Sequence, residues 1–261
     1  MIRSALLAAL LCLPALSAAA APAAAPDIAL YQTVLDRFVL DDGKVRYGAL
    51  KRDMGALEEF VTQMAAVGPH SHPGLFPSRE ERLAYWINAY NALVLHAFAA
   101  EYPEKKDRLA GLVGRGLFFY KRKFTVGGEK RTLADIENET IRKEFGEPRI
   151  HFAIVCASAS CPRLSRTAYT AANLEAQLES EAERFLNERR NAGIDRERRT
   201  VTLSKIFDWF AEDFGKNDGQ VLRYVGRYNR QVRAAVENGS WRIRYFEYDW
   251  SPNDAPAPAP E

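Results

Sequence analysis

The chain lacks an excess of charge of either sign, because 36 lysine and arginine residues stand against 34 aspartate and glutamate residues, for a net charge of +2. Nucleic-acid binders draw much of their affinity from basic side chains that neutralise phosphates, so the composition argues against a nucleic-acid partner. Long apolar runs are missing beyond residue 21, where no stretch approaches the 18 residues of a membrane-spanning helix. With 47% hydrophobic and 27% charged residues, the 261-residue chain has the composition of an ordinary globular protein.

The N-terminus has the pattern of an export signal. Arg3 supplies a positive charge, residues 5–16 form an apolar core, and small residues up to Ala21 offer cleavage sites. The apolar core is too short to span a bilayer as a helix. The sequence therefore predicts a signal peptide over residues 1–21, cleavage near Ala21, and a periplasmic protein.

Internal repeats and long linkers are also absent from the sequence, which favours one domain over residues 27–253. A Pro/Ala spacer at 22–26 precedes it, and a Pro/Ala tail at 254–261, expected to be extended and poorly ordered, follows it. Helical spacing of apolar residues dominates, with a few short strands between, so the fold class expected is α+β, a helix-rich single domain around a small sheet. Helices are expected at 28–39, 49–67, 79–100, 133–145, 171–188, 204–214 and 219–229, and strands at 44–47, 123–126, 129–133, 149–155 and 200–203.

Two amides interrupt the most hydrophobic of these helices, residues 79–100, which Ser78 and Glu81 are expected to open with a capping box. Asn88 and Asn91 are three residues apart and share one helix face. A buried amide needs specific hydrogen-bond partners. These amides either tie the helix to a neighbouring loop or line a site where they orient a substrate, and His96 lies just beyond them.

The segment 150–162 carries the most reactive side chains of the sequence. An apolar run containing His151 is expected to be a buried strand, and it ends in a loop with two thiols, Cys156 and Cys161, and two hydroxyls, Ser158 and Ser160. On a regular strand His151 and Cys156 would point to opposite faces. Cys161 lies beyond a flexible turn and can fold back to either of them.

Export removes Cys12 and leaves Cys156 and Cys161 in an oxidising compartment, where thiols tend to pair. Three interpretations remain open. The two thiols form a disulfide that closes a small loop; or Cys161 is a catalytic nucleophile activated by His151 or His96; or the pair binds a soft metal or exchanges disulfides, although its spacing differs from the usual C-x-x-C.

Other polar groups give weaker signals. His70 and His72 form an H-x-H pair in a proline-rich loop without neighbouring ligands, and a solvated loop is the simpler interpretation. Lys205, Asp208 and Asp213 remain as the polar groups between the aromatic residues of the helix expected at 204–214, where they form surface salt bridges or line a site. The sequence predicts no metal site and no cofactor.

Several motifs in order resemble the domain-of-unknown-function family DUF547. They are YWINAYNALVLH, TLADIEN, IHFAIVCASASCPRL, LSKIFDWFAEDF and FEYDWSPND, and the resemblance covers residues 45–253. It implies a helix-rich α+β domain and brings no settled activity. The family pattern usually has glycine after the first cysteine, where this chain has Ala157.

The helix that carries WINAYNALVLH, followed by the histidine-bearing strand, is similar in outline to papain-like and transglutaminase-like thiol enzymes. In those folds the nucleophilic cysteine opens the helix, whereas residues 85–88 here contain none. Fold analogy does not decide function.

Two functions are expected from these residues. The first is a thiol-dependent hydrolase or acyl transferase with Cys161 as nucleophile, His151 as base and Asn88 or Asn91 as orienter or oxyanion donor. The second is a non-catalytic exported domain, braced by a Cys156–Cys161 disulfide, that binds a small molecule, peptide or protein.

Overall fold

The computed structural model describes residues 23–237 and 239–255. The expected signal peptide over residues 1–21 and most of the expected tail lie outside these residues. None of the helices in the described ranges has the length and apolar character needed to cross a membrane.

Helices make up most of the described chain, which confirms the expected helix-rich α+β domain. The α-helices are α1 (Ile28–Phe38), α2 (Tyr47–Arg52), α3 (Gly55–Ala66), α4 (Arg79–Ala100), α5 (Leu112–Arg115), α6 (Lys143–Phe145), α7 (Leu174–Asn187), α8 (Ile206–Trp209), α9 (Ala211–Phe214), α10 (Asp218–Tyr228) and α11 (Arg230–Val236). The 3₁₀-helices are η1 (Pro73–Leu75), η2 (Lys106–Leu109) and η5 (Pro148–Phe152), and the π-helices are η3 (Gly116–Lys121) and η4 (Asp135–Arg142).

Two small sheets complete the fold. An antiparallel hairpin pairs β1 (Lys123–Val126) with β2 (Glu129–Thr132), as the Gly-Gly turn between them predicts. In the second sheet β4 (Thr200–Leu203) lies between antiparallel β3 (Ala192–Asp195) and parallel β5 (Arg242–Tyr245).

Helix α4 is the centre of the larger hydrophobic core. Ser78 accepts the Glu81 backbone N–H while the Glu81 carboxylate accepts the Ser78 N–H, so the expected capping box is confirmed. From Leu83 to Leu95 every residue of the helix is buried, because α2, α3 and η4 pack against it. A helix buried all round explains its continuous apolar sequence.

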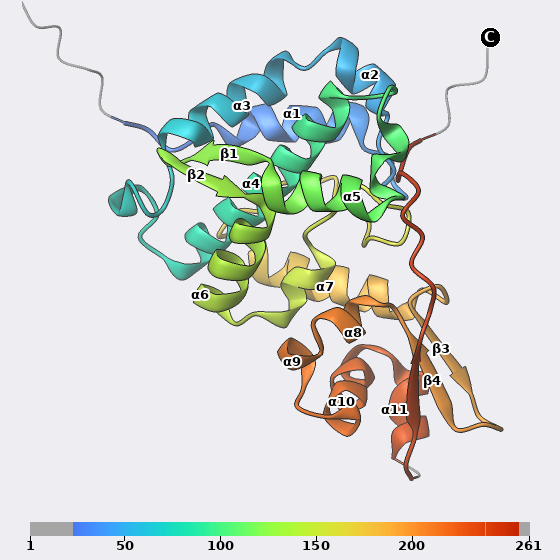
Figure 1. Cartoon of the computed structure of the whole chain (residues 1–261). Coiled ribbons are helices and arrows are strands. Elements are labelled where there is room, and N and C mark those ends of the chain that lie inside the picture. Colours follow the sequence, from blue (N-terminus) through green and yellow to red (C-terminus); the bar gives the residue numbers. More distant parts are fainter. Residues whose placement is uncertain (1–22, 238, 256–261) are drawn as a thin grey trace, which may run out of the picture.

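A smaller core joins α7, α10 and α11 to the three-stranded sheet at the other end of the molecule (Figure 1). Phe152 belongs to this core, while its neighbours Ile150 and Ala153 belong to the larger one. The 150–162 segment therefore lies at the junction of the two cores.

The chain after β5 spans that junction. Figure 1 shows this red segment running from the three-stranded sheet along the molecule to the region of α2. Val45 donates its N–H to the Asn253 carbonyl at 2.9 Å and accepts the N–H of Ala255 at 2.9 Å. Asp254, the first residue of the expected tail, pairs with Val45 in a β-bridge and accepts the Tyr102 hydroxyl at 2.6 Å.

The strand expected at 149–155 is wrong. Residues Pro148–Phe152 form the 3₁₀-helix η5, because Pro148 favours a first helical turn and the Glu147 carboxylate caps it by accepting the Arg149 N–H. A short apolar run does not distinguish a buried strand from a buried helical turn.

Two smaller expectations are also wrong. The single helix expected at 49–67 is interrupted at Asp53, whose non-helical backbone separates α2 from α3. In the strand expected at 44–47, only Val45 forms β-bridges, because Tyr47 already begins α2.

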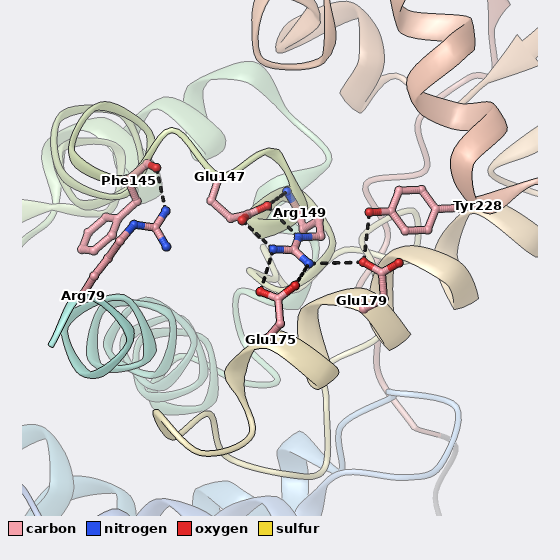
Figure 2. A network of polar contacts seen from close by, with 7 residues as sticks. All are labelled: Arg79, Phe145, Glu147, Arg149, Glu175, Glu179 and Tyr228. Atoms are coloured by element: carbon pink, nitrogen blue, oxygen red, sulfur yellow. Dashed lines mark hydrogen bonds and ion pairs between the residues drawn. The ribbon is translucent and has the colours of Figure 1, made fainter.

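Arg149 fastens η5 to α7 (Figure 2). Its guanidinium donates to Glu147 at 2.7 Å, to Glu175 at 2.6 Å and to Glu179 at 3.2 Å. Tyr228 of α10 donates to the same Glu179 at 3.2 Å. These contacts hold the start of the 150–162 segment against the smaller core.

Candidate functional site

A cavity of about 650 Å³ opens where the two cores meet. Its wall is formed by side chains of α4, α5, η3, η4, η5 and α8, by the thiol loop, and by the chain after β5. Its polar lining includes Tyr90, Arg115, Glu137, Asn138, Arg142, His151, Cys156, Cys161 and Tyr248, and its apolar lining includes Phe119, Trp209, Phe210 and Trp250.

Cys156 and Cys161 form a disulfide on this wall, with Cα atoms 6.3 Å apart. The Cys156 backbone N–H points at Cys161 Sγ, at an N–S distance of 3.0 Å. The hydroxyl oxygens of Tyr248 and Ser158 lie 3.3 and 3.4 Å from the same sulfur. Burial raises the pKa of Tyr248 above its usual range, so its hydroxyl remains a hydrogen-bond donor at neutral pH.

The loop closes through a left-handed residue, Ala157, with φ of 62°. This backbone region is unfavourable for residues with a Cβ atom. Glycine, which the resemblance would lead one to expect at this position, adopts this region freely, and the fully buried Ala157 adopts the same turn at a cost of about 1 kcal/mol.

His151 lies buried in the wall and contacts a carboxylate far away in the sequence. Its Nε2 lies 2.6 Å from Asp213 Oδ2, and its ring stacks on Phe210 with centroids 4.3 Å apart. Burial lowers the pKa of His151 even though Asp213 acts to raise it. The imidazole is therefore neutral near pH 7; with Nε2–H donated to Asp213, Nδ1 is the atom that can take a proton.

Arg142 completes this arrangement from η4. Its Nε and Nη2 donate to the two oxygens of Asp213 at 2.6 and 3.0 Å, a bidentate contact. Burial acts to raise the pKa of Asp213, but hydrogen bonds from His151 and Arg142 outweigh it and lower that pKa to about 2. Asp213 is thus a permanent anion that fixes the tautomer of His151.

Glu137 is a second titratable group in the cavity. Tyr90 of α4 donates its hydroxyl to Glu137 Oε2 at 3.1 Å. Burial raises the pKa of Glu137 to about 7, so a large share of this carboxyl is protonated at neutral pH. The cavity therefore combines a neutral imidazole with a carboxyl that titrates near pH 7, an arrangement typical of acid–base chemistry.

The two amides of α4 bond to backbone rather than to the histidine. Asn88 donates to the Tyr169 carbonyl at 2.7 Å and accepts the Tyr169 N–H at 3.0 Å. Asn91 donates to the Ala153 carbonyl at 2.9 Å and accepts the Val155 N–H at 2.8 Å. Both tie the helix to loops, and Asp213 occupies the position beside His151 that the sequence assigned to an asparagine.

The remaining candidates have separate surroundings. Ser158 is buried beside both sulfur atoms, 3.1 Å from Cys156 Sγ. Ser160 accepts the Asp249 N–H at 2.9 Å and holds the loop to the chain after β5. His96 lies half-buried on α4, where burial lowers its pKa, and it is not part of the cavity wall formed by described residues.

The H-x-H pair lies apart from the cavity. His70 contacts Glu144 at 3.0 Å and Arg131 at 3.1 Å, and Ser71 lies 2.9 Å from His72. Within residues 23–237 and 239–255, no group of three or more histidine, cysteine, aspartate or glutamate side chains is arranged to hold a metal ion.

Sequence reasoning missed most of the polar groups that line the cavity with His151. Asp213 appeared only among leftover polar groups, and Glu137, Arg142 and Tyr248 did not appear as candidates. Each is separated from the thiol loop by many residues, so only the fold brings them together. The one available signal was the place of Glu137, Asp213 and Tyr248 inside the motifs TLADIEN, LSKIFDWFAEDF and FEYDWSPND; Arg142 lies outside all three.

In the comparison with known families, the model of "Protein of unknown function, DUF547" matches residues 76–186. That stretch includes α4, η4, the thiol loop and most of α7. The motifs that begin at residues 203 and 246 lie beyond it. The comparisons with curated proteins and with solved structures gave no match.

Proposed function

We propose a function from the cavity alone, because this chain belongs to DUF547 through residues 76–186 and that family, of unknown function, lends it no activity. The cavity is the active site of a thiol-dependent hydrolase or acyl transferase. Cys161 is its nucleophile, His151 its base, and Asp213 the group that orients the base.

The surroundings of Cys161 Sγ carry this proposal. One backbone N–H and two hydroxyl oxygens lie within 3.4 Å of that sulfur. A disulfide sulfur gains little from such donors, whereas a thiolate gains much, since hydrogen bonds to a charged form lower the pKa. These donors support a thiolate at Cys161 after reduction.

The chemistry follows from the groups on the wall. His151 Nδ1 takes the thiol proton, and the Cys161 thiolate attacks an acyl carbon to form a thioester. The proton passes to the leaving group as the bond to it breaks. Water or a second acceptor, deprotonated by the same imidazole, then displaces the thiolate.

Reduction of the disulfide precedes each of these steps. A dithiol reductant transfers two electrons and two protons to the disulfide, yields the Cys156 and Cys161 thiols, and itself becomes a disulfide. Export to the periplasm, which the N-terminus predicts, would supply the oxidising conditions under which the nucleophile stays masked.

Single-cysteine variants test the assignment. The Cys156→Ser variant keeps the Cys161 thiol and the N–H of residue 156 that points at it. The Cys161→Ser variant keeps only the Cys156 thiol. Neither variant can form the disulfide, so each is the matched control for the other. With iodoacetamide at pH 6, we expect Cys156→Ser to be alkylated at least about tenfold faster than Cys161→Ser. Equal, slow alkylation of the two variants would contradict a nucleophile at Cys161.

The second candidate is a ligand-binding domain with a structural disulfide, and the anchoring of the loop favours it. Ala159 and Ser160 donate their N–H groups to the carbonyls of Ser251 and Asp249 at 2.7 and 3.1 Å. If the disulfide only braces this loop, reduction should lower the unfolding free energy by about 2 kcal/mol, and the two single-cysteine variants should react alike.

A further inference from the structure

Exposed large apolar side chains gather on one short segment of the described chain. Leu112 and Val113 of α5 are 80% and 77% exposed, and Leu117 and Tyr120 of η3 are 52% and 65% exposed. Single exposed apolar residues are ordinary, but a contiguous group marks an interaction surface. We refer to residues 112–120 as the apolar segment.

Lysines stand at both ends of the apolar segment. Lys106 precedes it, and Lys121 and Lys123 follow it, all exposed. Within the described ranges, none of these three lysines forms a salt bridge. Asp107 is the single acidic residue between positions 105 and 123. The surface therefore combines apolar side chains with unpaired positive charge.

We propose that the apolar segment docks on the surface of a lipid bilayer that carries anionic headgroups. Apolar side chains enter the headgroup boundary, while lysines beside them meet lipid phosphates; this is how interfacial segments bind membranes. Tyrosine and tryptophan favour the same boundary, and Tyr120 belongs to the segment. This docking does not depend on the cavity being catalytic.

The small number of apolar side chains favours a lipid surface over a protein. A stable protein interface engages about 20–30 residues on each side, whereas four exposed apolar side chains of one short stretch form this surface. Leu112 and Tyr120 also line the cavity. Docking would therefore bring the opening of the cavity against the headgroups.

Vesicle binding tests the proposal, with the protein purified without the signal peptide expected at residues 1–21. Vesicles of phosphatidylglycerol and phosphatidylcholine in equal amounts are compared with vesicles of phosphatidylcholine alone, by co-sedimentation at low and at physiological salt. We expect binding to the anionic vesicles that weakens as salt rises. Leu112→Ser/Val113→Ser should lower the affinity at least about tenfold, and Lys121→Gln/Lys123→Gln about tenfold or more.

Lys143→Gln is the matched control, because Lys143 is exposed but already paired with Glu139 on a different helix; it should bind as the unchanged protein does. Absence of binding to anionic vesicles would overturn the proposal, as would equal binding by the Leu112→Ser/Val113→Ser variant. Light scattering provides a second criterion: a dimer that the Leu112→Ser/Val113→Ser variant converts to a monomer, without vesicle binding, would assign the segment to a second copy of this chain.

Discussion

At the scale of single residues, Asp213 decides what His151 can do. Its carboxylate accepts the Nε2–H at 2.6 Å and directs basicity to Nδ1. Arg142 holds the same carboxylate with two further hydrogen bonds. An asparagine in this position would offer an amide that donates where the carboxylate only accepts.

We therefore expect Asp213→Asn to lower the unfolding free energy by about 1–3 kcal/mol, because Arg142 and His151 both lose a charged acceptor. Denaturant unfolding at pH 7 measures this change. Asp208→Asn is the control, since Asp208 is exposed and forms a surface salt bridge with Lys205, and its expected change is below about 0.5 kcal/mol. Equal effects of the two substitutions would show that Asp213 is an ordinary surface residue.

At the scale of elements, the π-helix η4 explains how the cavity acquires its polar wall. Its wider turn places residues five apart near one another, so Glu137 and Arg142 both reach the cavity. π-helical turns occur frequently at functional sites. An α-helix over the same residues, which the sequence predicted, would orient these two side chains differently.

Glu137 gives this element a pH-dependent stability. The pKa of its carboxyl is 4.5 when unperturbed, as in the unfolded chain, and about 7 in the folded protein. Below pH 4.5 the carboxyl is protonated in both the folded and the unfolded protein, so it adds nothing to the unfolding free energy. As pH rises towards 7 the unfolded state ionises first, so the fold loses stability, on the order of 3 kcal/mol in full above pH 7.

The Glu137→Gln substitution removes the stability loss caused by ionisation of the carboxyl, and its amide oxygen can still accept the Tyr90 hydroxyl. The variant should match the unchanged protein at pH 4 and exceed its unfolding free energy by about 3 kcal/mol at pH 8. Glu139→Gln, exposed on the same helix, should show no such pH dependence. A stability difference that is the same at both pH values would refute the raised pKa.

The sequence predicted elements well where a local pattern decides them. The Ser78–Glu81 pair and the Gly127-Gly128 turn are such patterns, and both are confirmed. The sequence prediction was wrong at η5, because its side chains are buried in both cores. Its residues are therefore as apolar as those of a buried strand, and the two cannot be told apart by composition. The sequence did not foresee β3 and β5, because pairing with β4 rather than local propensity forms them.

The candidate site was predicted only in part, for the same reason. The 150–162 segment stood out because reactive residues are adjacent in sequence there. Asp213 contacts His151 across 62 positions, and Tyr248 reaches Cys161 across 87. No spacing rule covers such contacts, since tertiary packing alone sets them.

At the scale of the whole molecule, the chain after β5 holds the two cores together. It supplies Tyr248 and Trp250 to the cavity and then pairs with Val45 beside α2. Near its end, the Asn253 side chain accepts the hydroxyl of buried Tyr47 at 2.8 Å. The cavity therefore depends on contacts made far from it.

A double-mutant cycle tests this connection. Asn253→Ala and Tyr47→Phe should each lower the unfolding free energy by about 1–2 kcal/mol, and the double variant by less than the sum. Tyr47→Phe combined with Ser78→Ala, which removes a distant helix cap, should be additive within about 0.5 kcal/mol. Additivity of the Asn253 and Tyr47 changes would argue against the contact.

The most direct test of the proposed nucleophile is the thiol pKa of the Cys156→Ser variant, followed by thiolate absorbance as pH rises. The donors around Cys161 Sγ predict a value below about 7, well under the usual 8.5 of a free cysteine. A value at or above 8.5 would show that these donors do not stabilise a thiolate, and it would contradict catalysis by Cys161.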